Sequence, residues 1–235
     1  MQLFFNPHID EHTQRITFDR AESNHIIRVL RKKINDPLYI TNGKGLLITA
    51  GICIANDKQC VAEVIHKERK DKTWKHNVHI AIAPTKSMDR FEWFLEKATE
   101  IGVDAITPIL CEHSERKVLK QERLEKILEA AMKQSLSYYL PRLNPLTSFQ
   151  DFIASEPEGQ YFIAHCYSSE KKHLKELIDT STPINILIGP EGDFSSTEIE
   201  EALKQKYIPI SLGATRLRTE TAGIVALTTV AVSSK

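Results

Sequence analysis

The stretch "LGATRLRTETAGIVALTTVAV", residues 212–232, joins a charged loop directly to one of the most apolar parts of the chain. The helix predicted from Glu220 onward is apolar on nearly every side, so more than one neighbour must bury it. A loop attached to a buried helix can move little. Arg216 and Arg218 lie in this loop, so their positions are restricted as well. Fixed guanidinium groups are useful where negative charge must be bound or must develop. The alternative is that both arginines form structural ion pairs, with Glu191 or with Glu220.

A second unusual loop, "IGPEGDF" at residues 188–194, follows another apolar run. Gly189 and Gly192 can adopt positive φ and place no Cβ in the way of a bound group, and Pro190 stiffens the turn. The alternative is a plain strand-to-helix turn, but Glu191 is a carboxylate held inside this constrained turn. A site made of these two loops, with glycine, proline and backbone groups, suits a neutral adenosine better than a pyrophosphate.

Five short apolar runs predict the strands of a mostly parallel sheet, because helical patterns lie between them. They are "VHIAIAP" (78–84), "AITPIL" (105–110), "QYFIAH" (160–165), "INILIGP" (184–190) and "IPISLG" (208–213). Ligands of open parallel sheets bind at the carboxyl ends of the strands. Both loops described above leave such ends, so this edge of the sheet is the predicted site.

Helices are predicted between these strands, each with a capping pair at its start or a breaker after its end. Residues 121–135 carry a helical repeat of apolar side chains and are followed by a breaker. The capping pairs are Asp89 with Glu92 and Ser195 with Glu198, and the breakers are Gly102 and Pro141.

The first 70 residues predict a small β-rich domain. Residues 38–68 alternate apolar and polar side chains around two turn signals, Asn42-Gly43 and Asn56-Asp57, which is typical of hairpins. The charged stretch "KERKDKTWKHN" has no apolar periodicity and is the predicted linker. The predicted domains therefore cover residues 1–70 and 74–235.

One short helix is predicted in this first domain, at "DRAESNHIIRVLRKK" (19–33). Asp19 is expected to cap it, with Glu22 completing a capping box. Spacings of four and three residues place polar side chains on one face of this helix. These are Asn24, Arg28 and Arg31, with His25 and Lys32 beside them.

The charge of the chain is unevenly distributed. The whole chain has a formal net charge of zero, but residues 1–70 carry 11 Lys and Arg against 8 Asp and Glu, a net of +3. This imbalance favours contact of the first domain with a polyanion, and the alternative is an ordinary solvated basic face.

Several classes of protein lack support in the sequence. The four cysteines show no CxxC pair or zinc-like spacing, so reduced thiols and no metal are expected. No GxGxxG, GxxxxGK[ST], GxSxG or HExxH motif occurs, which argues against dinucleotide enzymes, P-loop NTPases, α/β-hydrolases and zincins. No secretory signal and no apolar run of about 18 residues is present, so a cytoplasmic protein without a membrane span is expected.

Taken together, the two loops resemble those of the bacterial 16S ribosomal RNA (uracil-N3) methyltransferases, the RsmE family of the SPOUT superfamily. "HIIRVLR" (25–31), "TKSMDRFEWFLEKATEIGVDAITPI" (85–109) and "SER" (114–116) resemble further parts of that family, so the resemblance covers essentially the whole chain. It implies an α/β fold with a SPOUT-type parallel sheet, a carboxyl-terminal trefoil knot and a PUA-like β-barrel at the amino end. It also implies S-adenosylmethionine as cofactor, 16S rRNA of the small ribosomal subunit as partner, and a homodimer with the site at its interface.

The resemblance assigns roles to residues of this chain. The anion formed on the uracil would be stabilised by Arg218 or else Arg216, and Glu191 or Glu220 would accept the proton. The cofactor would contact Ile188, Gly189, Pro190, Glu191, Gly192, Leu212, Gly213, Leu217, Arg218, Thr219 and Thr221. The RNA would contact His25, Arg28, Arg31, Lys32, Lys33, Lys86, Arg90 and Arg116.

The chain departs from the family at two places. The family usually has a second glycine where this chain has Asp193, and Glu-Gln followed by an arginine where it has "KQSLSYYLP" (133–141). Two other functions stay open at this point. One is a ribose 2′-O-methyltransferase of the same superfamily, and the other is a non-catalytic RNA-binding or assembly factor that retains the fold.

Overall fold

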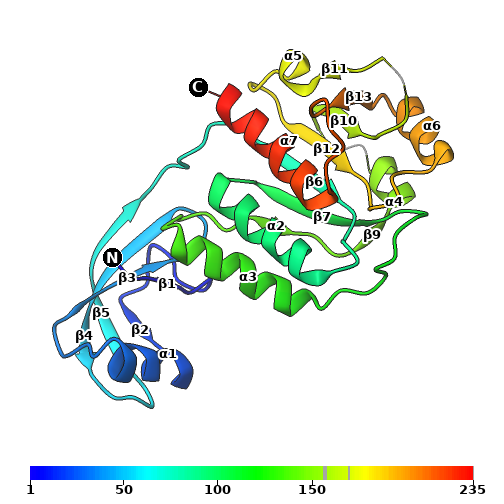
Figure 1. Cartoon of the computed structure of the whole chain (residues 1–235). Coiled ribbons are helices and arrows are strands. Elements are labelled where there is room, and N and C mark those ends of the chain that lie inside the picture. Colours follow the sequence, from blue (N-terminus) through cyan, green and yellow to red (C-terminus); the bar gives the residue numbers. More distant parts are fainter. Residues whose placement is uncertain (156–157, 169, 235) are drawn as a thin grey trace. The chain divides into compact units, whose positions relative to one another are not determined.

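The computed structural model describes residues 1–155, 158–168 and 170–234, and the chain divides into two compact units (Figure 1). The first unit consists of Met1–Lys72 and Met132–Leu140, and the second of Thr73–Ala131 and Pro141–Lys235. Residues 132–140 were predicted within the second domain, but they hydrogen-bond to the first sheet. The Leu140 N–H donates to the Gly43 carbonyl over 2.9 Å, and the Gly45 N–H donates to the Tyr138 carbonyl over 2.9 Å.

The first unit is built on a curled five-stranded sheet with the order β1-β3-β4-β5-β2. Its strands are β1 (Leu3–Phe5), β2 (Arg15–Thr17), β3 (Pro37–Thr41), β4 (Leu46–Ile54) and β5 (Val61–Arg69). Both predicted hairpins are confirmed, since β3 pairs antiparallel with β4 and β4 with β5. Strands β1 and β2 lie at the two edges of this sheet, and no pairing between them closes it among the described residues. The first unit is therefore an open curled sheet and not the closed barrel that was predicted.

The helical segment of the first unit differs from its prediction. Asp19 caps α1 (Arg20–Asn24), its carboxylate accepting from the Glu22 N–H over 2.8 Å, but a π-helical turn (His25–Val29) follows at once. Arg31 then adopts a left-handed φ of 54°. The predicted face of Asn24, Arg28 and Arg31 is therefore wrong, because an α-helical spacing does not continue through these residues.

The second unit contains a sheet with the order β11-β13-β10-β12-β6-β7-β8, in which all described pairs are parallel. The five predicted strands are confirmed as β6 (Val78–Ile82), β7 (Ala105–Leu110), β10 (Gln160–Ala164), β12 (Ile184–Ile188) and β13 (Ile208–Ser211). The short strands are β8 (Arg142–Leu143), β9 (Thr147–Ser148), which pairs with β7, and β11 (Lys172–His173). Because β10 lies between β12 and β13, the carboxyl ends of these three strands meet at one edge.

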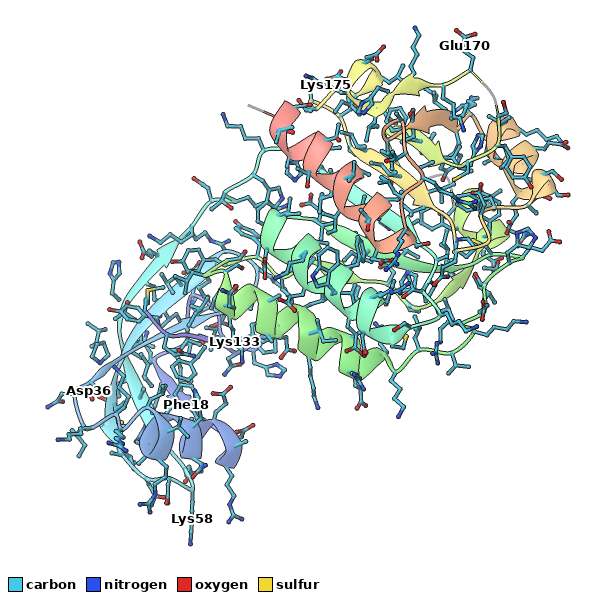
Figure 2. The ribbon with its side chains drawn as sticks, in the orientation of Figure 1. Phe18, Asp36, Lys58, Lys133, Glu170 and Lys175 are labelled. Atoms are coloured by element: carbon cyan, nitrogen blue, oxygen red, sulfur yellow. The ribbon has the colours of Figure 1, made fainter. Side chains whose placement is uncertain are left out.

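Helices cover both faces of this sheet (Figure 1). They are α2 (Met88–Ile101), α3 (Gln121–Gln134), α4 (Phe149–Ala154), α5 (Leu174–Leu177), α6 (Ser196–Lys204) and α7 (Thr219–Ser233). Helix α7 packs against α2, β6 and β12 on one face. On the other face α4 and α6 enclose a core that includes Phe149, Ile163, Leu187 and Phe194. Figure 2 shows side chains filling the space between α2, α7 and the strands. The trefoil knot concerns the threading of the chain and stays a prediction.

The predicted helix ends are confirmed in part. Ser195 and Glu198 form the capping box of α6, and Gly102 ends α2 with a φ of 105°. Helix α2 instead begins after Ser87, so the predicted cap at Asp89 is wrong. Helix α3 ends at Gln134, well before the predicted break.

Helix α7 is only partly covered within one chain. Gly223, Ala226, Leu227 and Val230 are buried, and a Cβ on Gly223 would lie 2.6 Å from the Phe94 ring, so α7 and α2 approach closely there. On another side Val232 is 58% exposed. The expectation of burial on nearly every side is therefore not met by a single chain, because Val232 is exposed and Ile224 and Val225 are only half-buried.

Candidate active site

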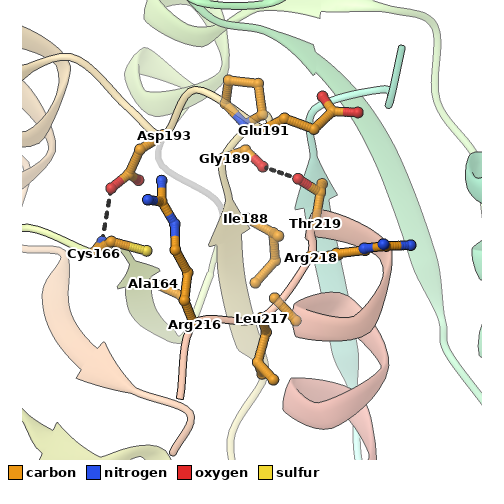
Figure 3. A pocket seen from close by; sticks show the side chains of 12 residues that line it. Ala164, Cys166, Ile188, Gly189, Glu191, Asp193, Arg216, Leu217, Arg218 and Thr219 are labelled. Carbon is orange, nitrogen blue, oxygen red and sulfur yellow. Dashed lines mark hydrogen bonds between the residues drawn. The ribbon is translucent and has the colours of Figure 1, made fainter. Parts of the chain in front are cut away.

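A pocket of about 290 Å³ opens at the carboxyl end of β12, between the two loops singled out in the sequence (Figure 3). A second pocket of about 460 Å³ adjoins it and shares five of its lining residues, which are Ala164, Cys166, Arg216, Leu217 and Ala222. Volumes of this order are those of small-molecule sites. The two hollows therefore form one crevice at the predicted edge of the sheet.

The two loops are tied to each other at the floor of this crevice. The Thr219 hydroxyl donates to the Gly189 carbonyl over 3.0 Å, and Thr219 is buried at the start of α7. A Cβ on Gly189 would lie 3.0 Å from the Phe194 ring, so the turn after β12 needs a glycine there. The end of β12 and the start of α7 are thus held as one rigid support.

Glu191 fixes a third loop beside the crevice. Its Oε1 accepts a hydrogen bond from the Lys86 N–H over 2.9 Å, and the Arg116 guanidinium donates to the Lys86 carbonyl over 2.7 Å. The Lys86 ammonium lies 2.8 Å from Glu115, and this hydrogen-bonded ion pair raises the pKa of Lys86. Glu191 itself is exposed and keeps its second oxygen for other partners.

Asp193 joins the crevice to the loop that follows β10. It has a left-handed φ of 66°, which Asp tolerates better than most residues. One carboxylate oxygen accepts from the Cys166 N–H over 2.7 Å, and the other accepts from the Phe194 N–H over 2.9 Å. Asp193 therefore places a carboxylate in the lining of the pocket and fastens its wall to the loop after β10.

Glu220 lies in the first turn of α7 and is 7% exposed. Its Oε1 is 3.9 Å from the Arg90 Nε, and its Oε2 is buried without a hydrogen-bond partner in the part of the chain that the structure describes. A carboxylate oxygen in this position can still accept a hydrogen bond. Glu220 does not line either hollow of the crevice.

Arg216 and Arg218 extend in different directions (Figure 3). The Arg216 side chain rises toward Asp193, whereas the Arg218 side chain extends past Thr219 to the other side of the loop. Both are exposed, and neither forms an ion pair with Glu191 or Glu220 among the described residues. The alternative of two structural ion pairs is therefore not realised, and both guanidinium groups stay available.

The structure brings together most of the predicted cofactor residues, but not all. Gly192 and Thr221 line neither hollow, and Gly192 instead lies against the His113 side chain. Leu212 and Gly213 line only the larger hollow. The predicted residues that do line the smaller hollow are Ile188, Gly189, Pro190, Glu191, Leu217, Arg218 and Thr219.

The wall formed by the loop after β10 was missed. Ala164 and Cys166 line both hollows, and Tyr167 and Lys171 line the larger one. This loop carries no motif, and its place follows only from the strand order, which puts β10 between β12 and β13. The general rule that ligands bind at strand ends could have found it, had that order been known.

The predicted RNA-binding residues fall into two groups, one in each unit. In the second unit Lys86, Arg90 and Arg116 surround Glu191 and Glu220 through the contacts given above. In the first unit Arg28 is paired with Asp57, with 2.6 Å between their side chains. His25 and Lys32 are half-buried, and Arg31 and Lys33 are exposed.

Two features are absent from the described residues 1–155, 158–168 and 170–234. None of the helices there is long and apolar enough to cross a membrane. No group of three or more His, Cys, Asp or Glu side chains there could hold a metal ion.

Comparisons with known proteins agree with this fold. Residues 72–231 match the RNA methyltransferase domain family, and residues 18–65 match the RNA methyltransferase PUA domain family. The chain is similar to the ribosomal RNA small subunit methyltransferase E of Buchnera aphidicola, with 30% identity over 87% of this chain and 83% of the relative. It is also similar to the protein of the same name from Bacillus subtilis, with 27% identity over 91% and 88% of the two chains.

Two crystal structures extend the comparison to the whole fold. A probable rRNA-methyltransferase from Porphyromonas gingivalis is 41% identical, with a TM-score of 0.92 over 100% of this chain and 98% of that chain. The ribosomal RNA small subunit methyltransferase E of Neisseria gonorrhoeae, solved bound to S-adenosyl methionine, is 25% identical, with a TM-score of 0.87 over 97% and 95%. The chain described here belongs to the ribosomal RNA small subunit methyltransferase E family of RNA methyltransferases.

Proposed function

We propose that this protein transfers a methyl group from S-adenosylmethionine to N3 of a uridine in the 16S rRNA of the small ribosomal subunit. The observation that carries the proposal is the joining of the loops at 188–194 and 212–219 into one crevice. Their tie through Thr219 and Gly189 keeps this crevice open. The family relationship supports the rRNA substrate, and the resemblance noted in the sequence supports the N3 position.

The residues of the crevice fit S-adenosylmethionine. Ile188, Leu217 and Ala222 supply apolar contact for an adenine ring. A Cβ on Gly213 would meet nothing within 4 Å, so the backbone there faces open space that a ligand can approach closely. When bound, this cofactor supplies an electrophilic methyl group on a sulfonium, and no metal or covalent enzyme intermediate is needed.

The protein must remove the N3 proton and stabilise the anion that this leaves on the uracil oxygens. Arg218 is the first candidate for the anion because it lines the crevice, its backbone is the N-cap of α7, and its exposed side chain forms no ion pair among the described residues. Arg216 is the second candidate, since it also lines the crevice. A single fixed donor of this kind contributes about 3 to 4 kcal/mol to transition-state stabilisation.

Two carboxylates are candidates for the proton acceptor. Glu191 lines the crevice, and one of its oxygens is free of the Lys86 N–H. Glu220 has a buried oxygen without a partner in the described chain, but it lies outside the crevice. Position favours Glu191 for direct proton transfer, and Glu220 would act through water.

The RNA would be held mainly through its phosphates. The N3 edge of uracil is hidden in any base pair, so the target uridine must be unpaired or flipped out. Arg31 and Lys33 in the first unit, and Lys86, Arg90 and Arg116 in the second, are basic side chains that can neutralise phosphates. RNA affinity that falls with rising salt is the expected signature.

A second copy of the chain would complete the protein as a homodimer. The support is that α7 is apolar on nearly every side, yet Val232 is 58% exposed and Ile224 and Val225 are only half-buried. Burial of these side chains by a second subunit would supply the further neighbour that the helix needs. The cytoplasm is the proposed compartment, because ribosomal RNA is the substrate.

Primer extension on 16S rRNA from cells that lack the protein tests the function. An N3-methyl group blocks Watson–Crick pairing and arrests reverse transcription, so one arrest site should vanish in these cells and return with the wild-type gene. A ribose 2′-O-methyl group leaves base pairing intact, so loss of a ribose methylation without loss of an arrest site would assign the rival activity. Absence of cofactor binding in calorimetry would favour the non-catalytic RNA-binding factor.

A further inference from the structure

Asp193 lines the smaller hollow of the crevice. It stands at the position where the family that the sequence resembles usually has glycine. Its main chain is left-handed, the conformation that makes glycine favourable at this position. The backbone of the loop would therefore form with glycine as well, and the carboxylate of Asp193 is not needed for its conformation.

The carboxylate is held in one orientation. Its Oδ2 accepts from the Cys166 N–H over 2.7 Å and its Oδ1 from the Phe194 N–H over 2.9 Å. The main-chain carbonyl of Asp193 lies 3.0 Å from the His113 Nδ1. A carboxylate offers about four acceptor positions, so two remain after these bonds. A fixed negative group thus lines the crevice with capacity to interact further.

The groups around Asp193 do not neutralise it by a direct ion pair. Arg216 extends toward it, but no hydrogen bond joins the two side chains among the residues drawn (Figure 3). The Lys171 ammonium donates to the His165 and Tyr167 carbonyls over 2.6 Å and 2.8 Å, and it interacts with Asp193 only through the electrostatic field. Asp193 therefore lines the crevice as a carboxylate without a direct ion pair among the described residues.

The two ligands of a methyltransferase differ in charge at one atom. S-adenosylmethionine carries a positive sulfonium, and S-adenosylhomocysteine, the product, carries a neutral thioether with otherwise the same groups. A fixed negative charge near a ligand stabilises the charged form more than the neutral form. We propose that Asp193 makes this site prefer the sulfonium donor over the thioether product, so that it lowers product inhibition. The inference rests on the proposed cofactor site.

The test compares the two ligands in the same variants, by calorimetry on the full-length protein at low and at high salt. Asp193→Asn is the variant, because Asn is similar in size and also tolerates the left-handed conformation. In wild type we expect S-adenosylmethionine to bind more tightly than S-adenosylhomocysteine. The preference is measured as the dissociation constant of S-adenosylhomocysteine divided by that of S-adenosylmethionine. In Asp193→Asn this ratio should fall by roughly fivefold to tenfold at low salt, and by less at high salt.

The ratio separates the effect of losing the charge from the effect of losing a hydrogen bond in the wall of the crevice. Asn offers one acceptor oxygen, so one of the N–H groups of Cys166 and Phe194 loses its partner, and this loss weakens both ligands alike. Asp179→Asn is the matched control, since it removes the same charge from a turn that lines neither hollow. An unchanged ratio in Asp193→Asn would overturn the inference, even if both affinities fell. A wild-type protein that bound neither ligand would instead overturn the proposed cofactor site, and the inference with it.

Discussion

The Thr219 hydroxyl donates a hydrogen bond to the Gly189 carbonyl, with 3.0 Å between the two oxygens, although the two residues are 30 positions apart in the chain. Thr219 starts the last helix, and Gly189 follows the central strand β12. Each loop alone is an ordinary turn. Their connection places the charged side chains of one loop against the backbone of the other, and this arrangement is the basis of the site.

Thr219→Val should weaken cofactor binding and lower stability. Valine keeps the shape of the side chain but leaves the Gly189 carbonyl without its donor, a loss of about 1 to 2 kcal/mol. Calorimetry with S-adenosylmethionine and thermal unfolding measure the two effects. Thr219→Ser retains the hydroxyl and should stay near wild type. Equal behaviour of the two variants would mean that the hydrogen bond does not hold the loops.

Arg218→Ala should lose methyl transfer while retaining cofactor binding. Removal of one fixed donor to a developing anion lowers kcat by about 10²- to 10³-fold. The measurement is transfer of labelled methyl groups to 16S rRNA, together with calorimetry. Arg123→Ala is the control, because Arg123 is exposed, pairs with Glu92 and does not line the crevice. Near-full turnover in Arg218→Ala would remove Arg218 from the mechanism and direct attention to Arg216→Ala.

Replacing exposed lysines of the first unit should change the salt dependence of RNA binding. Lys33→Ala removes an exposed cation, and each lost phosphate contact reduces the slope of log affinity against log salt by about 1. Arg28→Ala should have a smaller effect, since Arg28 is paired with Asp57. Filter binding of 16S rRNA at several salt concentrations measures the slopes. Slopes identical to wild type in both variants would assign these residues to a solvated surface.

His79 should make the protein less stable in mild acid. Burial lowers the pKa of His79 to about 4, with a further contribution from the charge of Arg142. Its Nε2 lies 2.6 Å from the Thr107 hydroxyl. The unfolded chain takes up a proton at His79 below its ordinary pKa of 6.5, whereas the folded chain does so only below about 4. The free energy of unfolding therefore falls as the pH falls through this window.

The size of this effect is about 2 kcal/mol between about pH 7 and pH 5, from the His79 contribution alone. Urea unfolding at several pH values measures it. The comparison is with His79→Gln, which cannot take up a proton and should lose this part of the pH dependence. If both proteins lost stability equally with falling pH, His79 would not be responsible.

Gly102→Ala should destabilise the second unit. Gly102 ends α2 with a φ of 105°, and a Cβ there would lie 2.6 Å from the Trp74 ring. Strain and overlap together are expected to cost about 2 to 4 kcal/mol. Gly213→Ala separates the two causes, because Gly213 also has a positive φ, of 144°, but a Cβ there meets nothing within 4 Å. Thermal unfolding should show the larger loss in Gly102→Ala, and equal losses would exclude the contact with Trp74.

Much of the second unit could be predicted from the sequence. Apolar runs of six or seven residues between helical patterns identified all five long strands, because strands buried on both faces need continuous apolar side chains. The capping box at Ser195 and the stop at Gly102 are local, since each depends on bonds within a few residues. The two loops of the site could be found for the same reason.

The tertiary structure alone decided the rest. The wall at Cys166 depends on β10 lying between β12 and β13, and the order of strands in a sheet is set by packing rather than by any local pattern. The different directions of Arg216 and Arg218 are seen only in the folded loop (Figure 3). The π-helical turn at His25 displaced the predicted basic face, because a single extra residue in a turn shifts all later side chains around the helix. Local hydrogen bonds and apolar periodicity can be read along a chain, but contacts between distant segments exist only once those segments are packed together.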